Sequence, residues 1–150
     1  MSSIIIVNKK QPSPQIAYDI KKYCGRGSVL GNEFSFMKMS QFETSQVKDR
    51  DEACDKMRLM LLKYLMDDKN LFPKSHKVKE AFNEIYSIYR KGNKLALECY
   101  CQNSDEDGIV DGKRCHTEDI REIVYTVERY INNGENPREA LLFLKNKWNI

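Results

Sequence analysis

The stretch KLALECYC, residues 94–101, alternates apolar with other side chains, and it follows Gly92 and precedes a polar run. Alternation of this kind predicts a β-strand, because successive strand side chains point to opposite faces of a sheet. Cys99 and Cys101 are two residues apart, so this strand would present both thiols on the same face. We therefore expect a strand here that carries a pair of candidate ligands.

Two further strands are expected nearer the N-terminus. SIIIV, residues 3–7, is a short β-branched run that is typical of a buried strand, and YDIKKYC, residues 18–24, is a second candidate. Pro12 and Pro14 separate the two, and neither can easily continue a ladder of backbone hydrogen bonds.

Four helices are predicted from apolar residues at helical spacing and from capping residues. The first covers residues 51–66, the second runs from an N-cap at Ser75 to Gly92, the third from a cap at Thr117 to Gly134, and the fourth begins with Asn136 as cap and Pro137 at its first position. Strands and helices in this order predict a small α/β domain, in which a short sheet of about three or more strands is flanked by four helices.

Length and composition bound the class of protein. A chain of 150 residues fits one domain over residues 1–150, with 41% hydrophobic and 31% charged residues. A net charge of +3, spread among acidic residues, argues against nucleic acid as a partner. Five cysteines, an odd number, and an N-terminal apolar run too short for a signal peptide or membrane span predict a cytoplasmic protein without a membrane partner.

A glycine-rich loop, CGRGSVLGN, follows the second strand candidate. Glycines allow consecutive backbone N–H groups to face one concavity, which suits a phosphate. An arginine and a serine would add charge and a hydroxyl, and an asparagine could read a sugar or a base edge. A plain tight connection explains the glycines equally, since no helix follows directly as a dinucleotide fingerprint requires. The candidate ligand-binding residues here are Gly25, Arg26, Gly27, Ser28, Gly31 and Asn32.

Three cysteines and a histidine, Cys99, Cys101, Cys115 and His116, form a candidate metal site. Three thiolates and an imidazole complete a tetrahedral zinc centre, so zinc is the expected cofactor, although the spacing is not the usual C-x-x-C. Two alternatives remain open. Cys115 beside His116 near a helix N-terminus has the elements of a nucleophile, and small buried cysteines also occur with no chemical role.

The acidic stretch NSDEDGIVD, residues 103–111, resembles part of a calcium loop. Carboxylate and amide side chains alternate as in such loops, but the closing glutamate is missing and Arg114 stands in its place. A solvated hairpin rich in turn-forming residues explains the stretch equally well.

Four separated stretches together resemble a known family. IIIVNKK, CGRGSVLGNEFSF, RDEACDKM and KLALECYC…RCHTEDI are similar, in this order, to the motifs of the DUF4326 family of phages and bacteria. Leu30 stands where the family has tryptophan and Glu33 where it has proline. The resemblance implies a divergent member with an acidic loop inserted at residues 102–114. The matching positions are Asn8, Gly25, Arg26, Gly27, Ser28, Gly31, Asn32, Phe34, Arg50, Cys99, Cys101, Cys115 and His116.

The resemblance implies that the glycine loop and the cysteines belong to one fold, and it adds Asn8 to the ligand-binding candidates. Two functions are therefore expected. The first is binding of a nucleotide or nucleoside, with a hydrolase or transferase acting on a nucleotide or ADP-ribose-like compound as its enzymatic form. The second is a zinc-stabilised module of phage origin that binds a host protein in the host cytoplasm.

Overall fold

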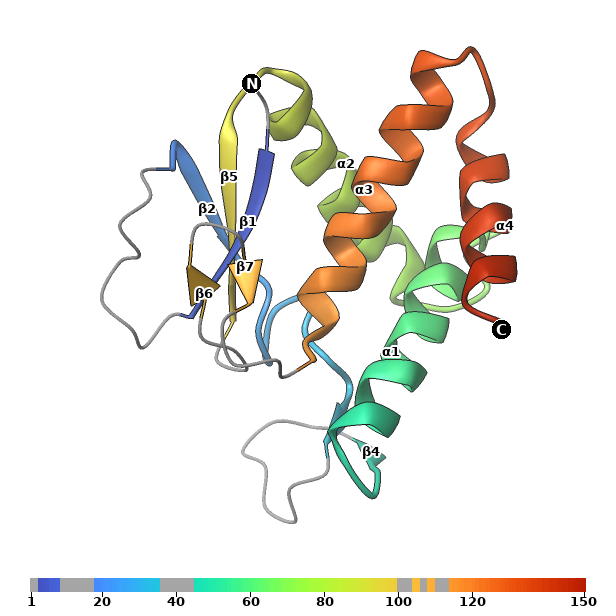
Figure 1. Cartoon of the computed structure of the whole chain (residues 1–150). Helices are drawn as coiled ribbons and strands as arrows, with labels where there is room; N and C mark the ends of the chain where they lie inside the picture. The colour runs from blue at the N-terminus through green and yellow to red at the C-terminus, as the bar shows by residue number, and fades with distance from the viewer. Residues whose placement is uncertain (1–2, 9–17, 36–44, 100–103, 106–107, 110–113) are drawn as a thin grey trace.

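The computed structural model describes residues 3–8, 18–35, 45–99, 104–105, 108–109 and 114–150 (Figure 1). A parallel sheet and four helices make up most of this part of the chain, which confirms the predicted α/β class. The strands are β1 (Ser3–Asn8), β2 (Ile20–Tyr23), β3 (Phe34–Ser35), β4 (Ser45–Gln46), β5 (Lys94–Cys99), β6 (Ser104–Asp105) and β7 (Gly108–Ile109), and the helices are α1 (Arg50–Leu65), α2 (Ser75–Arg90), α3 (His116–Asn132) and α4 (Pro137–Lys147).

The main sheet has the strand order β1-β5-β2, with both pairs parallel. In register, Asn8 lies opposite Cys99 and Tyr23 lies opposite Glu98, so the three strands end at nearly the same level. We call this end of the sheet the carboxyl edge. β5 is buried between two neighbours, which explains its apolar run: Leu95, Ala96 and Leu97 are fully buried.

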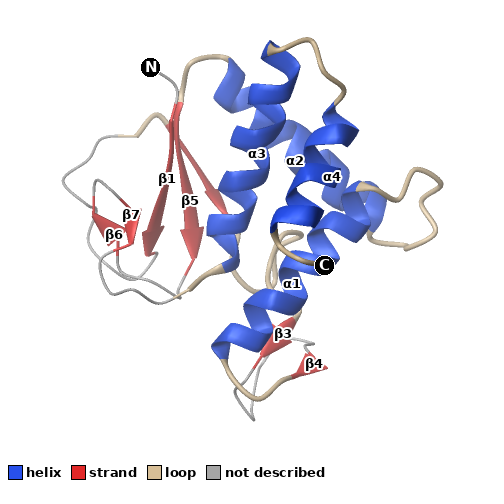
Figure 2. Cartoon of the chain, turned by 45° about the vertical axis from the view of Figure 1, so that its right-hand side comes forward, coloured by secondary structure: helices blue, strands red, loops and turns tan. Residues whose placement is uncertain are grey.

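The four helices lie on one side of the sheet in both views, with α2 and α3 nearest to it (Figures 1 and 2). Ile4, Leu95 and Leu97 belong to the large core that the helices share with the sheet. Ile5 and Ala96 alternate with them and pack in a separate cluster with Val7. The strand periodicity therefore sorts the apolar residues between the two faces.

Two predicted helix caps are wrong by one or two positions. The cap of α2 is Lys74, and Ser75 is the first helical residue. The hydroxyl of Ser75 donates to Asp67 Oδ2 at 2.6 Å. The cap of α3 is Cys115, whereas the hydroxyl of Thr117 donates to Cys115 Sγ at 3.1 Å. In both cases, the hydroxyl bonds a side chain and not a helical N–H.

The prediction for α4 is confirmed, because the side chain of Asn136 accepts a hydrogen bond from the backbone N–H of Arg138 and Pro137 occupies the first position.

The acidic stretch contributes a short antiparallel hairpin, in which Ser104 pairs with Ile109 and Asp105 with Gly108. This agrees with the hairpin alternative for that stretch. The hairpin contacts β1. None of the helices in the described part of the chain has the length and apolar composition needed to cross a membrane.

Candidate functional site

The carboxyl edge brings together segments that are far apart in the sequence. The glycine loop, residues 25–32, begins immediately after β2, and α3 begins beside the ends of β1 and β5 (Figure 1). In open α/β sheets, ligands bind outside the carboxyl ends of the strands, because the loops that follow the strands meet there. Cys99, Cys115 and His116 lie in the same region of the fold as the glycine loop.

His116 joins the two motifs directly. Its imidazole is 1% exposed, and its Nε2 lies 2.6 Å from the backbone carbonyl oxygen of Cys24. A carbonyl oxygen can only accept, so Nε2 carries a proton, and in the neutral imidazole Nδ1 then carries the lone pair. Nδ1 lies 3.6 Å from Cys115 Sγ. This tautomer turns the basic nitrogen toward the cysteines, which is the orientation that a metal-binding histidine adopts.

Cys99 and Cys115 form a close pair of buried thiols. Their Sγ atoms are 3.3 Å apart, and the two residues are 0% and 3% exposed. Both are unoxidised, as is Cys24 next to the glycine loop. Burial, reinforced by the neighbouring Cys99, raises the pKa of the Cys24 thiol to about 12. Cys24 is therefore a neutral thiol at physiological pH.

Two of the predicted site residues have no described side chain. Cys101 lies outside the described residues, and for Asn8 the structure describes the backbone in β1 but not the side chain. Among the Cys, His, Asp and Glu side chains that are described, no group of three or more has an arrangement that could hold a metal ion. The full predicted set of four zinc ligands thus includes one residue without a described position.

The glycine loop uses several of its polar groups internally. The backbone N–H and the hydroxyl of Ser28 both donate to the carbonyl of Gly25, at 3.1 and 2.6 Å. Arg26 Nη1 donates to the carbonyls of Asn32 and Phe34, at 3.0 and 2.8 Å. The amide of Asn32 donates to the carbonyl of Ala53 at 3.3 Å. These internal contacts brace the loop, and the sequence-based assignment of the same side chains to a ligand stays a prediction.

Packing accounts for two of the three glycines. A Cβ atom on Gly31 would collide with the backbone carbonyl of Gly25, and one on Gly25 would collide with the ring of Tyr23. Gly27 has φ of 88°, a conformation that L side chains rarely adopt. Within the described residues, the N–H groups of Gly25, Arg26 and Gly27 donate to no backbone or side-chain acceptor. These three consecutive N–H groups are candidate donors to an anion, with Gly25 buried, Arg26 half-buried and Gly27 exposed.

Charged residues also link the beginnings of α1 and α3. Arg114 Nη1 donates to Asp55 Oδ1 at 2.9 Å and lies 3.5 Å from Asp51 Oδ1. Arg50, a position of the family motif, directs Nη1 to the carbonyl of Arg114 at 3.4 Å. Sequence reasoning missed the roles of Arg114 and Thr117. The only available signal was their position on either side of the Cys115–His116 pair.

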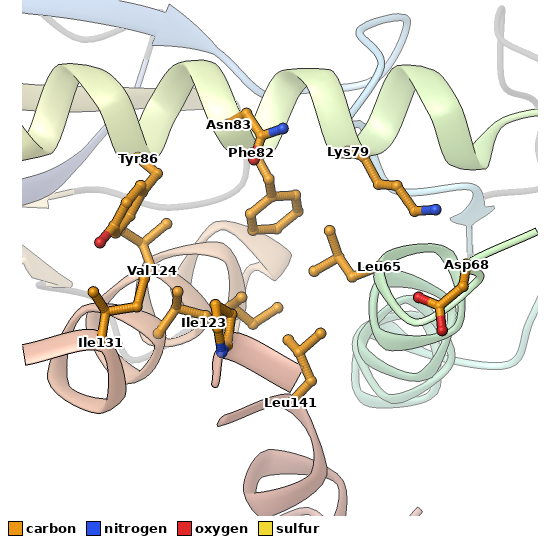
Figure 3. Close-up of a pocket in the computed structure, with 12 residues that line it drawn as sticks. Leu65, Asp68, Lys79, Phe82, Asn83, Tyr86, Ile123, Val124, Ile131 and Leu141 are labelled. Carbon is orange, nitrogen blue, oxygen red and sulfur yellow. The ribbon is translucent and has the colours of Figure 1, made fainter. Parts of the chain in front are cut away.

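A separate pocket of about 420 Å³ lies among the helices (Figure 3). Phe82, Ile123 and Leu141 line it, and Lys79 and Asp68 lie at one end. Lys79 Nζ donates to Asn70 Oδ1 at 3.0 Å and to the carbonyl of Asp67, while Asp68 accepts from Arg138 at 2.7 Å. None of the site residues predicted from the sequence lines this pocket.

Comparison with known proteins identifies one similarity. A family model described as a domain of unknown function, DUF4326, matches residues 7–126, which is well over half of the chain. No curated protein and no solved structure matches the chain significantly.

Proposed function

The chain belongs to the DUF4326 family, and we propose that it binds a nucleotide or nucleoside at the carboxyl edge of its parallel sheet. One observation carries this proposal: the glycine loop and the start of α3 meet at that edge, joined by the 2.6 Å contact between His116 Nε2 and the carbonyl of Cys24. Loops at the carboxyl ends of parallel strands are where α/β proteins hold such ligands.

The N–H groups of Gly25, Arg26 and Gly27 are the proposed phosphate donors. Their partial positive charges would converge on one anion, which suits the diphosphate or phosphate of a nucleotide. Ser28 and Gly31 shape the loop through their internal hydrogen bonds, and Arg26 and Asn32 brace it. Arg26 keeps its positive charge while it donates to these carbonyls, and this charge favours an anion nearby. Asn8, at the end of β1, is proposed to contact the sugar or base.

The pocket among the helices is a poorer candidate for this ligand. Its lining is mainly apolar, and its one lysine already has two acceptors, Asn70 and the carbonyl of Asp67. A phosphate there would lose its hydration and gain few donors, the side chains of Asn83 and Tyr86 among them, which is unfavourable. A hydrolase or transferase acting on a nucleotide or ADP-ribose-like compound is the enzymatic form of the proposal at the carboxyl edge.

Glycine substitution tests the proposal. The full chain is titrated calorimetrically with nucleoside mono-, di- and triphosphates and ADP-ribose, and each mixture is assayed for turnover by chromatography. Gly27→Ala should weaken binding by about tenfold or more, because alanine disfavours the positive φ that directs the amides. Gly92→Ala is the matched control. Gly92 has φ of 90° at the end of α2, so alanine there causes similar strain away from the loop.

Binding that is lost in Gly27→Ala but kept in Gly92→Ala supports the proposed site. If no compound in the panel binds, or if both variants bind as the wild type does, the proposal is wrong.

A zinc-stabilised module that binds a host protein is the second candidate. The observation that favours it is the arrangement of Cys99 and Cys115 with the lone pair of His116 Nδ1 turned toward them. Tetrahedral zinc would separate the two sulfurs to about 3.8 Å, a small movement from the present 3.3 Å. For the protein partner, α4 offers an exposed apolar pair, Leu142 and Phe143.

Metal analysis tests the zinc assignment. Under this second candidate, protein purified without chelators contains about one zinc per chain, and Cys115→Ser loses it. Cys54→Ser is the control, because Cys54 is also buried but lies on α1. Zinc well below one per chain in the wild type, or unchanged zinc in Cys115→Ser, would exclude these ligands.

A further inference from the structure

We propose that Cys99 and Cys115 are an oxidation site, which hydrogen peroxide converts to an intramolecular disulfide. The two sulfurs are 3.3 Å apart, and a disulfide bond is about 2.05 Å long. They belong to different elements, since Cys99 ends β5 and Cys115 caps α3. Closing the bond therefore requires a shift of about 1.2 Å between the sulfurs, which side-chain rotation and small movements of the segment ends can supply.

Two features of the structure surround the sulfur of Cys115. The hydroxyl of Thr117 donates a hydrogen bond to its Sγ at 3.1 Å. Cys115 also lies at the N-terminus of a helix of 17 residues, where the helix dipole favours negative charge on sulfur. We therefore write Cys115 as the sulfur that attacks the peroxide and Cys99 as the sulfur that resolves the product, and the separation of 3.3 Å permits either order.

Because both sulfurs are buried, the oxidant that reaches them must be small. With Cys99 fully buried and Cys115 only 3% exposed, a protein disulfide or glutathione has no approach to either sulfur. Hydrogen peroxide is nearly as small as water, so it is the oxidant best suited to reach this buried pair. This reaction is independent of nucleotide binding, because it requires only the two sulfurs and peroxide.

The chemistry balances in two steps. Cys115 sulfur attacks one oxygen of the peroxide, the O–O bond breaks, and Cys115 becomes a sulfenic acid while one water leaves. Cys99 sulfur then attacks the sulfenic sulfur, the S–O bond breaks, and the S–S bond forms while a second water leaves. The two sulfurs together lose two electrons, the two peroxide oxygens gain them, and the two thiol protons end in the two waters.

Peptide mapping tests the proposal on the full chain. Protein is treated with hydrogen peroxide, remaining thiols are alkylated in denaturant, and trypsin then produces peptides 95–113 and 115–121, which contain Cys99 and Cys115 respectively. Oxidation should remove about two free thiols per chain and yield these peptides linked, at their summed mass less about 2 Da. Dithiothreitol should separate them again.

Peptide 95–113 also contains Cys101, so variants decide which thiol is used. The link should form in the wild type, in Cys101→Ser and in the control Cys54→Ser, and should be lost in Cys99→Ser and Cys115→Ser. Three results would overturn the proposal: a link that survives in Cys99→Ser but disappears in Cys101→Ser, alkylation of both thiols without any link, or thiols that stay unreactive because a stoichiometric metal holds them. Nucleotide titration of the same samples separates this result from the proposed ligand site.

Discussion

Arg26 forms contacts that its residue type and its position among glycines do not predict. A guanidinium beside three glycines predicts a phosphate contact, yet Nη1 donates to the carbonyls of Asn32 and Phe34. Tight loops leave carbonyls without partners from regular structure, and a buried carbonyl must find a donor. The pattern G-R-G-S carries no information about these acceptors, because every residue has a carbonyl. Residue type therefore predicted the loop but not the direction of its side chains.

His116 can be tested at the same scale. His116→Ala would leave the carbonyl of Cys24 without its donor and open a cavity at a fully buried position. We expect the free energy of unfolding to fall by about 2–4 kcal/mol, measured by urea denaturation. The chain has one other histidine, which provides a matched control. His76 is exposed and pairs with Glu80 at the surface, so His76→Ala should change stability by less than about 0.5 kcal/mol. Equal effects of the two variants would contradict the structural role given to His116.

At the scale of elements, periodicity predicted the helices well and their first residues less well. Ser75 and Thr117 are typical capping residues, but their hydroxyls donate to side chains that tertiary structure brings close. Asp67 is the partner of Ser75. Its carboxylate also accepts from the backbone N–H groups of Leu71 and Phe72, and it thereby joins the end of α1 to the start of α2.

The Asp67 junction predicts a pH dependence of stability. The hydrogen bond from Ser75, followed by those from Phe72 and Leu71, holds the pKa of Asp67 below its ordinary value. The contribution of the carboxylate is therefore present above the unfolded pKa, about 3.9, and is lost as pH falls through the lower folded value. Asp67→Asn should be less stable than the wild type at pH 7, and the difference should shrink at about pH 3.

Urea denaturation at both pH values measures this difference. Asp68→Asn is the control, because Asp68 forms an exposed ion pair with Arg138 and should contribute less than about 1 kcal/mol. A wild-type advantage over Asp67→Asn that stays constant or grows toward acid pH would contradict the prediction.

At the scale of the whole molecule, one buried ion pair connects three helices. Arg58 of α1 donates to Asp119 of α3 at 2.9 Å, and its guanidinium lies 4.5 Å from the ring of Trp148, which follows α4. Burial raises the pKa of Asp119, and Arg58 opposes that shift. The arrangement connects α1, α3 and the residue that follows α4.

Removing one partner tests this connection. Asp119→Ala would leave the guanidinium of Arg58 without its carboxylate in a mostly buried position, so we expect a loss of about 2–3 kcal/mol, reduced from the full cost of a buried pair because Arg58 is partly exposed. Glu122→Ala is the matched control, since Glu122 of α3 pairs with Lys147 of α4 at the surface. It should cost less than about 1 kcal/mol. Thermal and urea unfolding measure both variants, and a smaller loss for Asp119→Ala than for Glu122→Ala would refute the prediction.

The sequence by itself determined the local structure and the family. Local structure follows from patterns among residues that are close in sequence, and these patterns can be recognised without the structure. They are the β-branched run of β1, the alternation in β5 and the apolar spacing of the helices. The motifs around Gly25 and Cys115 sufficed to identify DUF4326.

Only the tertiary structure decided the strand order and what each motif touches. His116 contacts the carbonyl of a residue 92 positions away, and Cys99 meets Cys115 across an intervening hairpin. Such contacts depend on strand register and on which loop ends at which edge of the sheet. These are properties of packing between distant segments, and local periodicity does not specify them.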